Sequence, residues 1–411
     1  MSVNLNDEHF DFKTIEEFDL KLFLTENKNQ SPEAFLLHSK YNTKNLNWFL
    51  AEQLKTYPKA VYKLPTFVAS HCWFTGKSYE QSSSESSALF KSSLFSGNRL
   101  LDLSGGLGID DWALSKSFKA VISLDPDHKL NELVRLNWKK VGTQNCVRID
   151  SKAEDFLGNA THETYDLVYL DADRRDKENR KQGIAEGSPN FFAIKELLFK
   201  QTNQVLLKLS PMIDINYCLK ELPHIQNIWI VSIEHEIKEI LCLLDQTKNL
   251  PVQIQTIEID KNGEQFQLSA DENCLHSTET INPKPENLYF FEPAAALIKS
   301  GLSTHFMNQF QFQALGKNTY YFTGNTVPYP LVKQGRIFQI ITQSHFAKST
   351  FLHYLKSISA ERINISARNF GLDAATIEKN FKLKTGGDDY FFFCKNQLDE
   401  KLFFHCRKIS D

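Results

Sequence analysis

The chain has 411 residues, of which 41% are hydrophobic and 24% charged, and its formal net charge is −3. This composition is typical of a globular protein with room for two or three domains, and it excludes a disordered or fibrous chain. A net charge so close to zero gives no global attraction to nucleic acid or to a membrane surface, so either partner would need a local patch.

The first residues and the cysteines predict a cytoplasmic protein. The start, MSVNLNDEHFDFKTIEEF, has acids where a secretory signal has basic and apolar residues, and no apolar run reaches the roughly 20 residues of a membrane span. The seven cysteines are scattered and form no Cys-x-x-Cys pair. We therefore expect reduced thiols, no metal site and no membrane contact.

Residues 1–95 predict a helical region. Apolar residues recur at helical spacing in IEEFDLKLFL, PEAFLLHS and NLNWFLAEQL, and polar turns, Pro58 and Pro65 interrupt the pattern. The segment EQSSSES near its end has two interpretations of equal weight. It is a flexible link, or it begins a helix that Ser83 or Ser84 caps while Gln81 lines a cofactor pocket.

Residues 96–280 predict a domain in which strands alternate with helices. The apolar runs RLLDL, KAVISLD, CVRID, YDLVYLD, QVLLKLS, IWIVSI and EILCLL are separated by segments with helical spacing. This alternation is typical of an α/β domain whose mostly parallel sheet is covered by helices on both faces.

Prolines and polar residues in INPKPEN mark the start of a third domain, residues 281–411. The strand-like segments RIFQII, RINISA, DYFFFCK and KLFFHCRK and the helical segments KSTFLHYLKSI and AATIEKNFKL predict a compact α+β module. Arg336, Arg368 and Phe370 are candidates for RNA contact by charge and stacking. Pairing of the two arginines with acids of the same domain is an equally good interpretation.

The stretch LLDLSGGLGIDDWA, residues 100–113, predicts a glycine-rich turn between the first strand of the α/β domain and a helix. A dinucleotide fingerprint would have its third glycine at position 111, where Asp111 stands. A pyrophosphate would also face the carboxylates of Asp102, Asp110 and Asp111. We therefore favour a positively charged ligand without phosphate, such as S-adenosylmethionine, and the alternative is a purely structural turn.

Five residues around this turn are candidates for binding S-adenosylmethionine. Asp102 ends the first strand and would order the turn or the ammonium group. Gly105, Gly106 and Gly108 let the backbone approach a ligand closely. Asp125 ends the next strand about 20 residues later, where a carboxylate can accept hydrogen bonds from both ribose hydroxyls.

The motifs LLDLSGGLGID, SLDPD and YDLVYLDADRRD resemble those of the class I S-adenosylmethionine-dependent methyltransferases, which implies a Rossmann-like sheet. More narrowly, the chain is similar to bacterial methyltransferase-like proteins with a C-terminal THUMP-like domain, through YEQSSSESSALFKSSL, LLKLSPMID, EHEIKEIL, FFEPAAALIKSG, QGRIF and RNFGL. This resemblance covers nearly the whole chain. It implies S-adenosylmethionine as cofactor and RNA as partner, because THUMP modules accompany RNA-modifying enzymes. It also implies an acid that holds adenine after the third strand, where Asp150 and Asp155 are both candidates and Asp155 enters the predicted site.

The fourth strand should carry the reacting end of the site. Ligands of open α/β sheets bind beyond the carboxyl ends of the strands, so Asp171, Asp173 and Arg174 are expected to border the methyl group. Their turn lacks the prolines and the aromatic residue of amino-base methyltransferases, and no cysteine follows the fifth strand for covalent carbon methylation. We therefore expect direct transfer to oxygen or nitrogen with Asp171 or Asp173 as proton acceptor, and a solvated loop with local ion pairs is the alternative.

Together these features predict an S-adenosylmethionine-dependent methyltransferase that acts on RNA, either tRNA or rRNA. The basic run RRDKENRK after the fourth strand is either a charged helix start or a phosphate contact. Two alternatives stay open. The protein is a non-catalytic RNA-binding protein that retains the methyltransferase fold, or it is a small-molecule methyltransferase, which would leave the C-terminal module without an evident role.

Overall fold

The computed structural model describes most of the chain. The described residues are 12–38, 44–159, 164–171, 173–174, 184, 187–277, 287–327, 331–358 and 362–409, without the side chains of residues 44, 45, 173 and 174. The chain divides into two compact units. The first comprises residues 1–213, 222–226 and 240–249, and the second comprises residues 214–221, 227–239 and 250–411. The predicted domain border at residue 281 lies outside the described residues.

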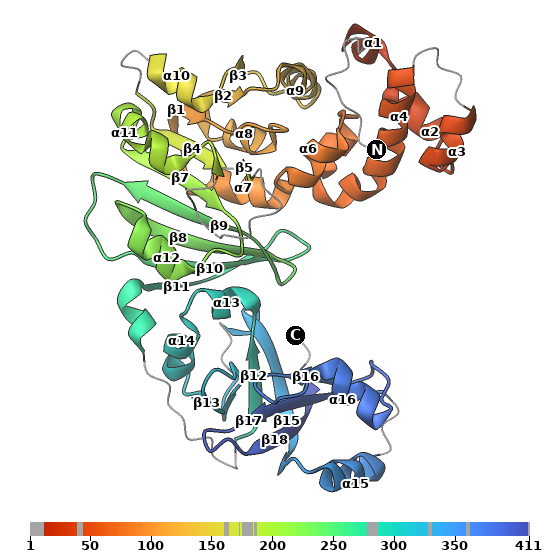
Figure 1. The fold of residues 1–411 in the computed structure, drawn as a ribbon, viewed down its shortest axis with the longest axis vertical. Coiled ribbons are helices and arrows are strands. Elements are labelled where there is room, and N and C mark those ends of the chain that lie inside the picture. Colours follow the sequence, from red (N-terminus) through yellow and green to blue (C-terminus); the bar gives the residue numbers. More distant parts are fainter. Residues whose placement is uncertain are drawn as a thin grey trace. The chain divides into compact units, whose positions relative to one another are not determined.

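Helices occupy the described part of the N-terminal region, as predicted (Figure 1). They are α1 (Phe12–Glu17), α2 (Leu20–Glu26), α3 (Pro32–His38), α4 (Lys44–Lys63), α5 (Pro65–Ala69), α6 (Gly76–Gln81) and α7 (Glu85–Leu94). Pro65 begins α5, but Pro58 lies inside α4 and does not interrupt it. Pro58 is exposed, and it removes one backbone hydrogen bond of α4 and crowds the carbonyl of the preceding turn, so α4 continues through it at a cost that its packing must offset.

A nine-stranded sheet follows, in the order β11-β10-β8-β9-β7-β4-β1-β2-β3. Its strands are β1 (Gly97–Asp102), β2 (Phe118–Asp125), β3 (Cys146–Asp150), β4 (Leu167–Asp171), β7 (Gln204–Leu209), β8 (Ile225–Ile233), β9 (Glu236–Asp245), β10 (Gln253–Ile259) and β11 (Gln265–Asp271). The helices between them are α8 (Ile109–Leu114), α9 (His128–Lys140), α10 (Ala153–Asn159), α11 (Phe191–Gln201) and α12 (Ile215–Glu221). The short strands β5 (Asp173–Arg174) and β6 (Gly187–Ser188) form a separate pair.

The sheet is parallel where the sequence predicts the cofactor site. Strand β1 pairs in parallel with β2 and β4, and β2 with β3 and β4 with β7 do the same. Strands β7 and β9 are antiparallel, as are β10 and β11, so the whole sheet is mixed. Parallel strands present their carboxyl ends at one edge, and β1, β2 and β4 end there in Asp102, Asp125 and Asp171. The expected α/β fold is confirmed.

The C-terminal module contains a second sheet, in the order β13-β14-β12-β15-β18-β17-β16 (Figure 1). Its strands are β12 (Tyr289–Pro293), β13 (Gln313–Ala314), β14 (Phe322–Gly324), β15 (Gly335–His345), β16 (Asn364–Ala367), β17 (Asp389–Lys395) and β18 (Lys401–Lys408). The short 3-10 helix η2 (Glu272–His276) precedes the module, and its helices are α13 (Ala295–Lys299), α14 (Ser303–Gln309), α15 (Lys348–Ile358) and α16 (Ala374–Phe381). The expected α+β module is confirmed.

Alternating side chains of β17 fill two separate aromatic cores of this module. Phe392 and Cys394 pack with Phe290 in one core, while Phe391 and Phe393 pack with Phe351 in the other. Successive side chains of a strand point to opposite faces, so the segment FFFC is buried on both. The sheet is therefore covered on both faces, which explains why β17 contains so little polar sequence.

A buried amide connects the N-terminal helices to the α/β domain. Asn137 of α9 is fully buried, and its Oδ1 accepts a hydrogen bond from the Trp73 N–H at 2.8 Å. Its Nδ2 donates to the Trp73 carbonyl oxygen, also at 2.8 Å. One side chain thus satisfies both polar backbone groups of Trp73, so the position of the helices depends on it.

We expect Asn137→Ala to destabilise the protein strongly. The change leaves a buried N–H and a buried carbonyl without partners, which costs about 1–3 kcal/mol each. Urea denaturation should therefore show a loss of about 2–5 kcal/mol in the free energy of unfolding. The control is Asn159→Ala, which removes one exposed hydrogen bond to the Asp155 carbonyl and should cost under about 0.5 kcal/mol. Equal losses in the two variants would contradict the structural role of Asn137.

Candidate functional site

The glycine turn between β1 and α8 is built on three glycines with different requirements. A Cβ at Gly105 would lie 1.8 Å from Arg148 Nη1 and 2.2 Å from Ser123 Oγ, so no other residue fits there. Gly106 and Gly108 have φ angles of +47° and +74°, in the left-handed region that disfavours side chains. Within the described residues, a Cβ at Gly106 would meet only one atom, a carbonyl oxygen at 3.8 Å. The backbone is therefore open to close approach at Gly106.

Asp102, at the end of β1, fixes the conformation of this turn through hydrogen bonds. Its Oδ1 accepts hydrogen bonds from the Ser104 N–H at 2.7 Å and from Ser104 Oγ at 3.0 Å. Ser104 Oγ accepts in turn from the Asp171 N–H at 2.7 Å, which connects the turn to β4. Asp102 is only 1% exposed. Its contacts are those of a residue that orders the turn, and its burial leaves no surface for an ammonium group.

Asp125 lies at the open side of the turn. Its Oδ2 accepts a hydrogen bond from the Gly106 N–H at 3.1 Å, and its Oδ1 accepts one from the Asp127 N–H at 2.9 Å. Burial raises the pKa of Asp125, against the opposing effect of the Arg148 guanidinium, whose Nη2 lies 3.7 Å from Oδ2. The side chain is 17% exposed. A carboxylate has about four acceptor positions, so Asp125 can still accept hydrogen bonds from a ligand.

Arg148 of β3 pairs with Asp111 in the first turn of α8. Its Nη1 donates to Asp111 Oδ2 at 3.2 Å and to Ser123 Oγ at 2.7 Å, and both charged side chains are fully buried. Its Nη2 donates to the Gly106 carbonyl oxygen at 2.6 Å. The guanidinium thus supports the turn directly and places a positive charge beside Asp111.

Asp110 has a separate set of partners. It accepts hydrogen bonds from Ser83 Oγ at 2.7 Å and from the Tyr169 hydroxyl at 3.0 Å, and Lys91 Nζ lies 3.1 Å from its Oδ1. Burial alone would raise the pKa of Asp110, but the charges of Lys91 and Lys208 together with hydrogen bonds from Ser83 and Lys91 lower it. Lys91 belongs to α7, so the helical region contributes a buried charge to the site.

These contacts correct one premise of the sequence analysis. Three carboxylates do not face a ligand at the turn, because Asp102 and Asp111 are 1% and 0% exposed and Asp110 is paired with Lys91. The acids are therefore structural supports of the turn. Asp125 is the acid that reaches its open side.

Asp102 and Asp111 are neighbouring buried acids with raised pKa values. Burial raises the pKa of both carboxyl groups, and the neighbouring Asp111 raises that of Asp102 further. Arg148 opposes the shift at Asp111. The upward shift of the pKa is therefore larger at Asp102, and Asp111 is the acid that pairs with Arg148.

The remaining cofactor candidates lie on helices. Ser84 caps α7 by accepting a hydrogen bond from the Ser87 N–H at 3.2 Å, so the segment EQSSSES begins a helix. Gln81 ends α6 and is exposed. Asp155 is exposed in α10, whereas Asp150 accepts hydrogen bonds from Asn131 and Arg135. The roles of Gln81 in the pocket and of Asp155 toward adenine stay predictions.

At the reacting end, Asp171 forms an ion pair with Lys208. Asp171 ends β4, and Lys208 is its register partner on β7. Both side chains are partly buried, at 32% and 14% exposure. Lys208 was not among the site residues predicted from the sequence, although a lysine near the end of the apolar run QVLLKLS was a usable signal. Asp173 and Arg174 form β5, but their side chains, like the run RRDKENRK, lie outside the described residues.

In the C-terminal module, the predicted RNA-contacting residues have internal partners. Arg336 Nε donates to Glu292 Oε2 at 2.8 Å, and Arg368 Nη2 donates to Glu292 Oε1 at 3.2 Å. This is the pairing with the domain's own acids that the sequence left open. Phe370 is 1% exposed in the aromatic core, so the stacking role predicted for it is wrong. Contact of the two arginines with RNA stays a prediction.

The described residues contain neither a membrane-spanning helix nor a metal-binding cluster. None of their helices is long and apolar enough to cross a membrane. No group of three or more histidine, cysteine, aspartate or glutamate residues in that part of the chain is arranged to hold a metal ion.

The raised pKa of Asp102 predicts that stability falls as the pH rises. The pKa of Asp102 is raised above the ~3.9 of an unfolded aspartate, so its contribution to stability is complete below about pH 4 and is lost as the pH rises through the folded pKa. Asp102→Asn keeps an acceptor for Ser104 and supplies an uncharged donor toward Asp111. Between the unfolded and the folded pKa of Asp102, we expect the variant to gain stability over the wild type by up to about 1.4 kcal/mol per pH unit.

Urea denaturation from pH 5 to pH 9 checks this expectation. The control Asp155→Asn changes an exposed carboxylate and should follow the wild type at every pH. If the curves for Asp102→Asn and the wild type run parallel, Asp102 does not carry a proton in the folded protein.

The chain is similar to known proteins in its C-terminal sequence and in its whole fold. Residues 335–408 match the family model described as THUMP domain-like. A candidate methyltransferase of Porphyromonas gingivalis W83 has a similar crystal structure, with a TM-score of 0.86, 24% identity and coverage of 98% of this chain and 100% of that chain. No curated protein sequence matches the chain significantly.

Two further solved structures match a smaller part of the chain. A candidate methyltransferase of Streptococcus mutans in complex with SAH has a TM-score of 0.29 and 16% identity, over 39% of this chain and 94% of that chain. A candidate RNA methyltransferase of Pyrococcus horikoshii has a TM-score of 0.30 and 13% identity, over 39% of this chain and 80% of that chain. The chain therefore has the fold of the Porphyromonas gingivalis protein over almost its whole length and carries a THUMP-like domain at its C-terminus.

Proposed function

We propose that the protein is an S-adenosylmethionine-dependent methyltransferase that modifies RNA by direct transfer to oxygen or nitrogen. The observation that carries the proposal is the position of Asp125. Its carboxylate ends β2 beside the open backbone of Gly106 and keeps free acceptor positions. The similarity of the whole fold to a protein described as a candidate methyltransferase supports the same conclusion.

The residues at the turn fit a nucleoside. Asp125 is suited to the two ribose hydroxyls, and Gly106 leaves room for a ligand against its backbone. In this proposal, Asp155 binds the adenine and Gln81 lines the pocket. S-adenosylmethionine, when bound, supplies an electrophilic methyl group on a sulfonium. The buried side chains of Arg148 and Lys91 already pair with Asp111 and Asp110, so neither cation is available to bind a phosphate group.

At the reacting end, Asp171 and Lys208 would act as a pair. The Lys208 ammonium pairs with the Asp171 carboxylate and fixes its orientation at the end of β4. An ionised carboxylate can accept the proton that leaves the attacking oxygen or nitrogen of the substrate. Asp171 is therefore the proposed proton acceptor, and Lys208 is its positioning residue. Asp173 and Arg174 follow directly on the chain and are proposed to border the same site.

RNA is the proposed substrate because the C-terminal module matches a THUMP-like model over residues 335–408. Such modules accompany RNA-modifying enzymes, as the sequence resemblance implies. A small-molecule substrate would leave this module without a role. In this proposal the module captures RNA, and the domain with the glycine turn transfers the methyl group.

Calorimetry with the full chain tests the cofactor. We expect heat of binding with S-adenosylmethionine and with its demethylated product, and at least about tenfold weaker binding of both by Asp125→Ala, because hydrogen bonds to a charged group contribute about 1.5–3 kcal/mol each. The control Glu154→Ala changes an exposed acid of α10 and should bind like the wild type. No heat from the wild type with either ligand at millimolar concentration would refute the cofactor assignment.

Transfer of a tritiated methyl group to total RNA from a deletion strain tests the reaction. We expect Asp171→Asn and Lys208→Met to lower the rate by about 100-fold or more, in the range of a lost general base, while the affinity for the cofactor stays unchanged. Lys208→Arg should recover part of the rate, since a guanidinium can also pair with Asp171.

Two results would redirect the assignment. Tight RNA binding by the wild type without methyl transfer would indicate a non-catalytic RNA-binding protein. Label that appears only in the small-molecule fraction of an extract would indicate a small-molecule methyltransferase.

A further inference from the structure

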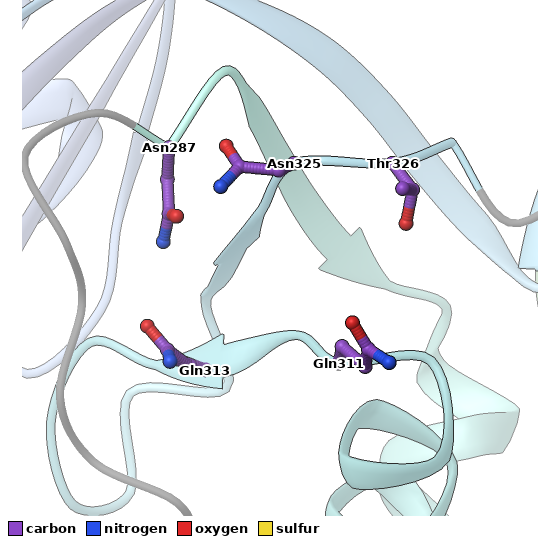
Figure 2. Close-up of a pocket in the computed structure, with 5 residues that line it drawn as sticks. All are labelled: Asn287, Gln311, Gln313, Asn325 and Thr326. Atoms are coloured by element: carbon purple, nitrogen blue, oxygen red, sulfur yellow. The ribbon is translucent and has the colours of Figure 1, made fainter.

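A polar pocket lies in the C-terminal module before the segment that matches the THUMP-like model. Its volume is about 150 Å³, and it is lined by Asn287, Gln311, Gln313, Asn325 and Thr326 (Figure 2). Figure 2 shows these side chains arranged around a common space, from the chain before β12, the loop after α14, β13 and the loop after β14. The pocket holds several times the ~30 Å³ that one water molecule occupies in the liquid.

The lining has the chemistry of a site for a neutral, hydrogen-bonding ligand. Four of the five described lining residues are carboxamides and the fifth is a hydroxyl, so none of them carries a charge. A phosphate would require arginine, lysine or a set of backbone N–H groups, and an apolar ligand would not repay the desolvation of four amides. A carboxamide presents donors and an acceptor side by side, which suits a planar ligand with the same pattern at its edge.

Two of the amides are held in place by the surrounding backbone and side chains. Asn287 is 8% exposed, and its Nδ2 donates to Thr323 Oγ1 at 2.9 Å. Asn325 Oδ1 accepts a hydrogen bond from the Leu288 N–H at 3.2 Å. Gln313 Oε1 is buried and has no hydrogen-bond partner in the described part of the chain. A buried acceptor without a partner costs free energy, which a ligand donor would recover.

Gln311 occupies a position where glycine is normally preferred. The end of α14 forms a Schellman motif, in which the Phe312 N–H donates to the Met307 carbonyl at 2.8 Å and the Gln311 N–H to the Asn308 carbonyl at 3.0 Å. Gln311 is the left-handed residue of this motif, with φ of +60°. Helices usually place glycine there, because other side chains are strained. A glutamine that points to the pocket from this position suggests that its side chain is retained for binding.

We propose that this pocket binds an unpaired nucleobase of RNA, with a preference for adenine. Asparagine and glutamine form paired hydrogen bonds to the N6 donor and N7 acceptor of adenine. Proteins read unpaired RNA bases through such hydrogen bonds to the base edges. RNA as the source of the base rests on the proposed function, whereas the chemistry of the pocket does not. The pocket residues 287–326 precede the THUMP-like match at 335–408, so the site is an addition to that domain.

Fluorescence anisotropy with labelled hexa-adenylate and hexa-uridylate tests the pocket in the full chain. The titration contains saturating S-adenosylhomocysteine, so that adenosine groups of the RNA do not compete for the proposed cofactor site. We expect the wild type to bind hexa-adenylate more tightly than hexa-uridylate. Gln313→Leu and Gln311→Gly should each weaken hexa-adenylate binding about fivefold or more and reduce the preference, as expected for the loss of a paired base contact.

The two variants separate binding from folding. Gln311→Gly removes a strained side chain, and Gln313→Leu removes a buried acceptor that has no partner, so the melting temperature should stay equal or rise. The control Gln343→Ala changes an exposed carboxamide of β15 outside the pocket lining and should bind like the wild type. Equal binding of the two RNAs, unchanged binding by both pocket variants, or no binding at all would overturn the proposal. The methyl-transfer and calorimetric results do not enter this test, so it can fail while the proposed function stands.

Discussion

The buried guanidinium of Arg148 is the constraint on which the candidate site depends. It donates hydrogen bonds to four acceptors: the side chains of Asn131, Asp111 and Ser123 and the Gly106 carbonyl oxygen. A guanidinium in this position fills the space where a Cβ of Gly105 would lie. The turn therefore requires glycine because of the arginine beneath it. A buried arginine also requires a buried anion, which explains why an acid follows the glycines at position 111.

A second buried ion pair makes the N-terminal helices part of the same site. Lys91 in α7 pairs with Asp110 in α8, and Tyr169 of β4 donates to the same carboxylate. Buried ion pairs contribute little net stability, because desolvation offsets their attraction, but removal of one partner is costly. The ion pair between Lys91 and Asp110 fixes the positions of the elements that carry these residues. The helical region, the glycine turn and β4 meet at Asp110, so they are held in one arrangement around the proposed cofactor site.

The strand ends and the glycine turn of the candidate site could be predicted from the sequence, because both depend on local patterns. The spacing of apolar runs placed Asp102, Asp125 and Asp171 at neighbouring strand ends, and the structure has them there. The burial of Asp102 and Asp111 was not predictable in this way, since it depends on Arg148, which lies 37 residues beyond Asp111. The aromatic residues of the C-terminal module show the same limit. Phe370 has the composition of a stacking residue, but only the packed core determines which aromatic side chains are exposed.

The distribution of charge limits how the C-terminal module could hold RNA. Arg336 and Arg368 are both paired with Glu292, which is 5% exposed, so their removal would leave a buried carboxylate with no opposite charge and only the Ser366 hydroxyl as a partner among the described residues. Their charges are therefore already used within the module, and the whole chain has a net charge of −3. Affinity for RNA that comes from phosphate contacts falls steeply with salt, whereas hydrogen bonds to a base edge depend on salt only weakly. If the amide pocket is the main RNA contact of this module, binding should depend on the base more than on ionic strength. This combination distinguishes capture of an unpaired base from the general attraction of a basic surface.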